Sequence, residues 1–127
     1  MVGLAREALD AFNRQDFDRA IQLIHPDAVL VRPGGLPEVR GTAAVRAWME
    51  PDAIEAQDQQ LLGSEATGPR TLLTRNRVLA RGTASGIEME FHTWNVWTFD
   101  DDGLMTRFEY FLDHDEGAAR RSAGLGD

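Results

Sequence analysis

The chain has 127 residues, 43% of them hydrophobic, and it contains neither cysteine nor lysine. This length suits one domain with its own core, while the missing residue types exclude disulfides, thiolate nucleophiles and lysine Schiff bases. The formal net charge of −8 opposes nucleic acid or an anionic membrane surface as a partner.

The first half of the chain predicts three helices and one short strand. Apolar residues recur at helical spacing, as in Leu4, Ala8 and Phe12, which share one stripe. Asp16 is placed to cap the second helix, and Pro26 should end it, because proline disfavours helix in the residue before it. The predicted helices cover residues 4–14, 17–24 and 43–49, with a strand at 28–32.

The second half of the chain predicts strands. Side chains alternate between apolar and polar along 88–99, and residues 100–103 read as a hairpin turn rather than a calcium loop, since the closing glutamate is missing. Strands are predicted at 53–67 (irregular), 71–81, 88–99 and 104–113, followed by a weak helix or frayed tail at 116–125. Helices followed by strands predict an α+β fold, with helices on one face of a curved antiparallel sheet.

Charge decides which face of this sheet is predicted to face inward. If the three arginines of strand 71–81 share a face with Glu88 and Glu90, opposite charges meet. The other register would bury unpaired arginines beside Phe91 and Trp97. The favoured register turns these side chains inward: Leu72, Thr74, Asn76, Val78, Ala80, Phe91, Thr93, Asn95 and Trp97. It leaves Trp94 on the charged outer face, where we interpret it as a homodimer contact.

Two stretches carry a resemblance to a known family. Residues 41–48 (GTAAVRAW) and 96–113 (VWTFDDDGLMTRFEYFLD) resemble the SnoaL-like branch of the nuclear transport factor 2-like superfamily, and the resemblance covers residues 4–113. It implies a single SnoaL-like domain over 1–127, with a tail at 114–127. The implied fold is an α+β cone of cystatin-like topology, commonly a homodimer, whose curved sheet and N-terminal helices enclose a pocket. The superfamily hosts isomerases, cyclases, hydrolases and binders, so function depends on the site.

The resemblance to ketosteroid isomerases of this superfamily extends to single positions. Asn95 stands where they carry the protonated aspartate that helps hold an oxyanion, and an amide can donate the same hydrogen bond. Arg32 stands in place of their catalytic base and Ala8 in place of their oxyanion tyrosine. Ketosteroid isomerase activity is therefore not expected, because a guanidinium cannot accept a proton at neutral pH. The pocket positions matched are His25, Phe108, Tyr110 and Leu112. Asp113 is the nearest candidate for the acid/base aspartate of SnoaL-like cyclases.

Several candidates keep two interpretations. His25 either satisfies carbonyls at a helix end or acts as an acid/base in the pocket. Asn76 and Asn95 either pair with each other or with water, or they contact a substrate. An inward Arg32 is a buried cation that needs a partner. The candidate partners are Asp27, Glu38, Asp113 and a ligand carboxylate.

The sequence thus predicts a pocket for a small hydrophobic molecule with a polar or anionic end. If the protein is an enzyme, it would be a cofactor-independent isomerase, cyclase or hydratase acting on a carbonyl compound; the alternative is a non-catalytic binding or dimerisation module. We expect neither a metal nor a cofactor. We expect a cytoplasmic location, because no membrane span or targeting pattern is present. The predicted catalytic residues are His25, Asn95, Tyr110 and Asp113. The predicted substrate-binding residues are Arg32, Trp48, Asn76, Phe91, Trp97, Phe108 and Leu112.

Overall fold

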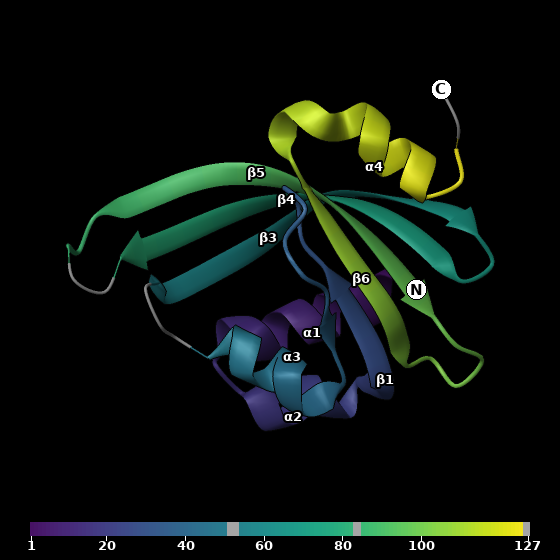
Figure 1. The fold of residues 1–127 in the computed structure, drawn as a ribbon, viewed down its shortest axis with the longest axis horizontal. Coiled ribbons are helices and arrows are strands. Elements are labelled where there is room, and N and C mark those ends of the chain that lie inside the picture. The colour runs from purple at the N-terminus through teal and green to yellow at the C-terminus, as the bar shows by residue number, and fades with distance from the viewer. Residues whose placement is uncertain (51–53, 83–84, 126–127) are drawn as a thin grey trace.

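The computed structural model describes residues 1–50, 54–82 and 85–125 and has the predicted α+β fold (Figure 1). Its helices are α1 (Val2–Asn13), α2 (Phe17–Gln22), α3 (Thr42–Met49) and α4 (Glu116–Ser122), the last preceded by the 3-10 turn η1 (Asp113–Asp115). Its strands are β1 (Ile24–Val31), β2 (Val39–Arg40), β3 (Ile54–Gly68), β4 (Thr71–Gly82), β5 (Glu88–Phe99) and β6 (Met105–Leu112). No helix within these ranges is long and apolar enough to cross a membrane.

The strands form one curved sheet that is not closed into a barrel, in the order β2-β1-β6-β5-β4-β3. The neighbours from β3 to β6 pair antiparallel, but β1 runs parallel to β6. The prediction of a purely antiparallel sheet is therefore wrong at this pair. The physical reason is connectivity, because four other strands separate β1 from β6 along the chain and no hairpin fixes their relative direction.

The segment around Pro26 differs from its prediction. Helix α2 ends at Gln22 rather than residue 24, and the predicted strand at 28–32 begins earlier, at Ile24. The Met105 N–H donates to the Leu23 carbonyl (3.0 Å), which draws this segment onto β6. His25 consequently lies in a strand and not at a helix end, in the extended conformation that a residue before proline prefers.

The predicted register between the two central strands is confirmed. Arg77 lies opposite His92, and its Nε donates to Glu90 Oε1 (2.6 Å) on the outer face. Arg81 pairs with Glu88 on the same face at 3.1 Å. On the inner face, the residues from Leu72 to Ala80 predicted to point inward are buried. Charge pairing therefore selected the correct face from the sequence.

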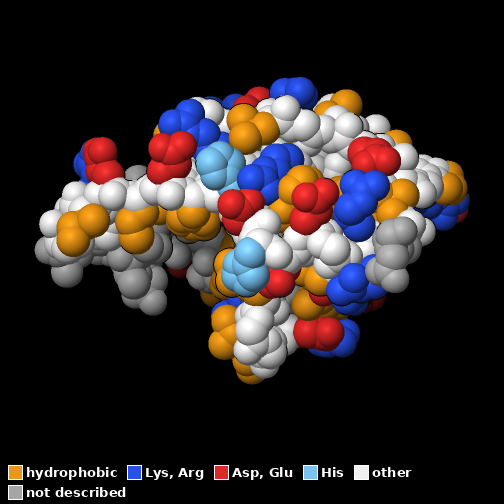
Figure 2. Space-filling model, turned by 90° about the horizontal axis from the view of Figure 1, so that it is seen from above, with side chains coloured by type: hydrophobic (Ala, Val, Ile, Leu, Met, Phe, Trp, Pro, Cys, Tyr) orange, Lys and Arg blue, Asp and Glu red, His pale blue; other side chains and the backbone are white. Residues whose placement is uncertain are grey.

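Helices cover both faces of the sheet (Figure 1). Helices α1, α2 and α3 lie against the inner face, where the main core forms. Helix α4 lies on the outer face, where Ala119 and Ala123 pack on Leu73 and Val96. The C-terminal segment, predicted as a weak helix or a frayed tail, is thus a packed helix over most of its described length. Seen from this side, acidic and basic side chains alternate over the surface (Figure 2).

Trp94 has partners within its own chain. The Arg75 guanidinium lies 4.4 Å from the centre of its ring, and Trp94 Nε1 donates to the Asp113 carbonyl (3.1 Å). Trp94 also packs against the cluster beneath α4. These contacts remove the reason for which Trp94 was assigned to a homodimer interface. The homodimer itself stays a prediction, to be checked by light scattering of the eluted protein.

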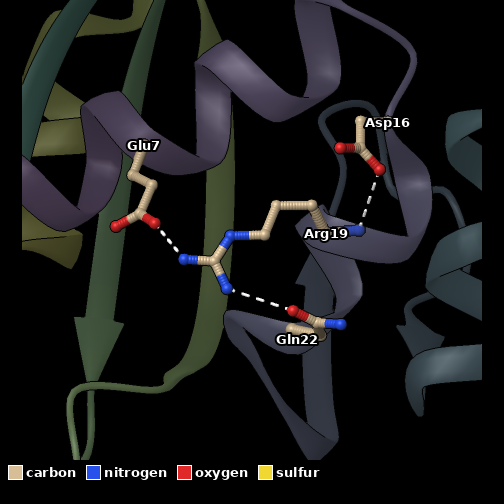
Figure 3. Close-up of polar contacts among 4 residues, drawn as sticks. All are labelled: Glu7, Asp16, Arg19 and Gln22. Carbon is tan, nitrogen blue, oxygen red and sulfur yellow. Dashed lines mark hydrogen bonds and ion pairs between the residues drawn. The ribbon is translucent and has the colours of Figure 1, made fainter.

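Arg19 ties α2 to α1 (Figure 3). Its backbone N–H donates to Asp16 Oδ1 (3.2 Å), which confirms Asp16 as the cap of α2. Its guanidinium forms an ion pair with Glu7 on α1 and donates to Gln22 Oε1 (3.1 Å). The ion pair joins the two helices, whereas the contacts with Asp16 and Gln22 stay within α2 and its cap.

Candidate functional site

A cavity of about 280 Å³ lies between the inner face of the sheet and α3. We name it the polar cavity. It is lined by Pro33, Trp48, Gln59, Val78, Phe91, Thr93, Asn95, Phe108, Tyr110 and Leu112. Phe91 and Leu112 are each 42% exposed, so they lie at its mouth. Of the predicted site residues, the structure brings together Trp48, Phe91, Asn95, Phe108, Tyr110 and Leu112.

A smaller apolar cavity of about 70 Å³ adjoins the first and reaches toward α1 and α2. The two cavities share Trp48, Gln59 and Phe108 as walls. Trp97 lines the smaller one, with its ring packed edge-on against Phe108 at 4.7 Å. Trp97 was predicted to bind substrate. The structure places it deeper, behind Phe108.

A block of four buried polar side chains supports the polar cavity. Thr74 lies opposite Asn95, and Asn76 lies opposite Thr93, across β4 and β5. Each threonine hydroxyl donates to the asparagine two residues on in its own strand, at 2.8 Å in both cases. Trp97 Nε1 donates to Thr74 Oγ1 (2.9 Å), which extends the block into the core. Buried polar groups are stable only when hydrogen-bonded, so this network fixes the orientation of both amides.

The two asparagines therefore differ in what they can offer a ligand. Asn76 is fully buried, and its Nδ2 donates to Gln59 Oε1 (3.3 Å), so it is a supporting residue and not part of the wall. Asn95 lines the cavity, and its Oδ1 accepts from Thr93. Within the described part of the chain, the structure records no acceptor for Asn95 Nδ2. This amide nitrogen is the donor best placed for a bound molecule.

Tyr110 lies directly opposite Asn95 in the pairing of β5 with β6, and both line the polar cavity. Its ring stacks obliquely between Trp48 (6.3 Å) and Phe108 (6.4 Å). Burial raises the pKa of the Tyr110 hydroxyl above its ordinary value of 10.0, while the positive charge of Arg32 acts in the opposite direction. At neutral pH the hydroxyl is therefore protonated and can donate a hydrogen bond.

Arg32 follows β1 directly and precedes Pro33, which lines the polar cavity. Its Nη2 donates to the Pro37 carbonyl (2.9 Å), and its Nε is buried without a hydrogen-bond partner. It does not itself contribute to the walls of the cavity. Its positive charge opposes the effect of burial on the pKa of Tyr110, and its neighbour Pro33 lines the cavity.

The structure keeps two of the predicted catalytic residues away from the polar cavity. His25 Nδ1 accepts from the Asp27 backbone N–H (2.9 Å), a local contact in β1. Asp113 is exposed and forms an ion pair with Arg75, whose guanidinium covers Trp94 on the outer face. Asp113 lies just past the end of β6 at Leu112, in the 3-10 turn η1. Its ion pair is on the outer face, whereas Asn95 lines the cavity on the inner face. Within the described ranges, no group of three or more His, Asp or Glu side chains could hold a metal ion.

Four wall residues were not predicted as site residues: Pro33, Gln59, Val78 and Thr93. Two of them, Gln59 and Thr93, carry polar side chains. Gln59 lies in β3, whose pairing with β4 is interrupted by three register shifts, so its polar sequence gave no clear inward face. Asn13 at the end of α1 holds this point of β3, donating to the Gln59 carbonyl (2.9 Å) and accepting from its N–H (2.8 Å). Thr93 did carry a signal, because the pattern Thr-x-Asn occurs at 74–76 and again at 93–95 on neighbouring strands.

Tyr110 is the one tyrosine of the chain, so its titration can be followed directly by the ultraviolet absorbance of tyrosinate. We expect a midpoint above 10.0 in the folded protein, because burial disfavours the charged form. Since the folded-state pKa is raised, this group's contribution to stability is complete below the unfolded pKa and is lost as the pH rises through the folded pKa.

The same titration tests whether Arg32 acts on Tyr110. The variant Arg32→Gln removes a nearby positive charge, so we expect the midpoint to rise further. Arg107→Gln is the matched control, because Arg107 is exposed on the other side of β6 and the variant changes the net charge equally. Equal midpoints in both variants would contradict the placement of Arg32 beside Tyr110.

Comparison with known proteins supports the fold described above. The chain superimposes on Rv0760c from Mycobacterium tuberculosis, solved in complex with estradiol-17beta-hemisuccinate, with a TM-score of 0.78, 14% identity, and coverage of 90% of this chain and 94% of that one. The superposition on the Delta 5-3-ketosteroid isomerase from Mycobacterium sp. has a TM-score of 0.76 and 16% identity, and it covers 90% of this chain and 93% of that one. The superposition on SalBIII, an epoxide hydrolase/cyclase-like enzyme with a role in pyran ring formation in salinomycin, has a TM-score of 0.77 and 15% identity. It covers 87% of this chain and 88% of that one.

At these low identities the TM-scores show a shared fold, the cone of the nuclear transport factor 2-like proteins. No curated protein sequence matches the chain significantly. The model of the SnoaL-like domain matches residues 5–108, close to the range 4–113 over which the sequence resembles the family. This match spans most of the chain and includes all of its sheet except the last residues of β6. The chain therefore belongs to the SnoaL-like domain family.

Proposed function

We propose that the protein binds a small hydrophobic molecule with a polar end in the polar cavity. One observation carries this proposal: aromatic walls surround four neutral hydrogen-bonding side chains, Gln59, Thr93, Asn95 and Tyr110. Ligand sites in proteins are commonly concave and mostly apolar, with a few polar groups that fix orientation. The volume of about 280 Å³ is at the lower end for such sites, so the ligand is small. The complex of Rv0760c with a steroid hemisuccinate supports a hydrophobic ligand for this fold.

The proposal can be tested with N-phenyl-1-naphthylamine, a neutral dye that fluoresces when it leaves water. We expect saturable, one-site enhancement with the wild-type protein. Leu112→Trp should abolish it, because residue 112 lies at the mouth and is exposed enough to accept a larger side chain. Leu62→Trp is the matched control, since Leu62 is also exposed and lines neither interior cavity. Equal dye binding in both variants would contradict the proposal.

The opposed pair of Asn95 and Tyr110 favours a second candidate function, the cofactor-independent isomerisation, cyclisation or hydration of a hydrophobic carbonyl compound. Two donors on adjacent strands can both reach one carbonyl oxygen and stabilise the charge that develops on it. Such chemistry also needs a group that moves a proton. Among the described residues that line the polar cavity, Tyr110 alone titrates, and its raised pKa makes it a donor rather than a base. The geometry therefore supports binding better than turnover.

Turnover can be sought with a β,γ-unsaturated steroid ketone, followed by the ultraviolet absorbance of the conjugated product. We expect no acceleration over buffer if binding is the function. A rate that depends on protein concentration and falls in Asn95→Leu would support the enzyme instead. Binding of the neutral dye to the same preparation confirms that the cavity is intact.

A further inference from the structure

We propose that the polar cavity selects molecules whose polar end is an anion, such as a carboxylate, and that Arg32 binds this anion. This inference rests on the proposed binding function and names the class of ligand. The observation behind it is that Arg32 is a half-buried cation beside the cavity with no carboxylate partner among the residues that the structure describes.

Arg32 follows directly after the end of β1, the strand that pairs with β6. In that pairing Leu30 lies level with Phe108 and Val31 with Glu109, one residue before Tyr110. Pro33, the next residue along the chain, lines the polar cavity. The positive charge of Arg32 also acts on the Tyr110 hydroxyl, a wall residue of that cavity. The guanidinium therefore lies near the end of the cavity that Pro33 and Tyr110 form.

Arg32 is unlike the other half-buried arginines. In the described part of the chain these are Arg19, Arg32, Arg46, Arg75, Arg77 and Arg120. All but Arg32 form an ion pair with an aspartate or glutamate. A partly buried charge is stable when it is paired, so five of these sites are satisfied within the protein and one is not.

The carboxylates that could have satisfied Arg32 are engaged elsewhere or are not paired with it. Glu38, six residues along the chain, pairs with Arg40. Asp113 pairs with Arg75 on the outer face. No ion pair joins Arg32 to Asp27 or to any other carboxylate in the ranges the structure describes. Within these ranges Arg32 is thus a cation without a carboxylate partner, and it is available to an anionic ligand.

The hydrogen bonds of Arg32 lead to the same conclusion. A guanidinium stays protonated at any physiological pH and has five N–H donors in a planar fork that matches a carboxylate. One Arg32 nitrogen donates to the Pro37 carbonyl (2.9 Å), and Nε is buried with no acceptor. The Pro37 carbonyl holds the side chain in place without neutralising it. An anion would neutralise the charge and accept from the free donors.

The walls of the cavity do not oppose an anion. The described residues that line the polar cavity include no aspartate or glutamate, although the chain as a whole has a net charge of −8. Asn95 and Tyr110 add two neutral donors on the same wall. A ligand with an apolar body and an anionic end would place the body against Trp48 and Phe108 and direct the anion toward Tyr110 and Arg32.

Two dyes that differ by one anionic group test this inference. The anionic dye is 8-anilino-1-naphthalenesulfonate, and N-phenyl-1-naphthylamine is the same molecule without its sulfonate. We expect the wild-type protein to bind the anionic dye about tenfold more tightly, the effect of roughly one charge-assisted hydrogen-bonded contact. Arg32→Gln should remove this preference and leave the affinity for the neutral dye within about twofold, since the apolar walls are unchanged.

Control variants separate the role of Arg32 from net charge. Arg107→Gln removes one positive charge from an exposed position and should keep the preference for the anionic dye. Arg32→Lys keeps the charge without the planar fork and should retain part of the preference. The far-ultraviolet circular dichroism of each variant checks that the fold is kept.

The possible outcomes distinguish this inference from the proposed function. Neutral-dye binding that is blocked in Leu112→Trp, with no preference for the anionic dye, would overturn the role of Arg32 and leave the binding function standing. A preference that persists in Arg32→Gln would overturn it as well. If neither dye binds in a manner sensitive to Leu112→Trp, both the binding function and the anion site fail.

Discussion

Replacing Trp97 with alanine is expected to lower the free energy of unfolding by about 3–5 kcal/mol. Trp97 is 3% exposed and lies at the centre of the inner core, where its ring packs edge-on against Phe108 at 4.7 Å. A small cavity already adjoins the indole, so removing it leaves a larger void and loses the contacts that line it. The measurement is urea unfolding of both proteins followed by circular dichroism, with the unfolding midpoint and slope compared.

Two further variants divide this loss into packing and hydrogen bonding. Trp97→Phe keeps most of the ring but removes the donor to Thr74 Oγ1 (2.9 Å), so we expect a loss of about 1–3 kcal/mol. Trp94→Ala removes an equal side chain from the outer face, where Trp94 is only half-buried, and should cost less than Trp97→Ala. If Trp94→Ala cost as much as Trp97→Ala, the assignment of the main core to the inner face would be contradicted.

The central sheet of this chain was predictable because the charge pattern and the hydrophobic pattern indicate the same buried face. The arginines of β4 can meet the glutamates of β5 only when both lie on one face, and that arrangement buries Trp97, Asn95 and Thr93 together on the other. The parallel pairing of β1 with β6 was not predictable in the same way. It depends on how segments far apart in the chain meet, and a strand pattern does not carry its direction.

The site was predicted in its walls but not in its polar details. Phe108, Tyr110 and Asn95 follow from alternation along two strands whose register was known. Asp113 could not be placed, because it lies just past the end of β6, where alternation stops and the chain enters a 3-10 turn. Gln59 was missed because bulges in β3 shift which residues face inward. Whether these residues act on a ligand stays a prediction.

The role of Arg32 required three-dimensional information for a different reason. The sequence offered three protein carboxylates and one ligand carboxylate as partners, and it favoured a protein carboxylate because fixed structural pairs are the commoner way to satisfy a buried arginine. Ion pairs are set by tertiary distance, and the structure commits Glu38 to Arg40 and Asp113 to Arg75. Arg32 therefore differs from the other half-buried arginines of the described ranges in having no ion pair with a carboxylate. This difference becomes visible only when these arginines are compared in the structure.

The second large effect is expected at α4, which the sequence did not identify as part of the core. Ala119→Asp should lower the free energy of unfolding by more than about 3 kcal/mol, because it buries a carboxylate with no partner. Ala119 is 0% exposed and packs with Ala123 over Leu73 and Val96 on the outer face. An ionised aspartate there must either lift α4 from the sheet or take up a proton. Either response is visible in urea unfolding, and the second makes the loss smaller at low pH.

Ala118→Asp is the matched control for this experiment. It introduces the same residue one position earlier in the same helix, where the side chain is only half-buried and its carboxylate can reach water. Helix propensity and net charge change equally in the two variants, so a difference between them measures burial against the sheet. We expect Ala118→Asp to cost less than about 1 kcal/mol. Equal and small losses would mean that α4 is not packed in solution, and the outer face around Leu73 and Val96 would then be open, restoring the case for a partner at that surface.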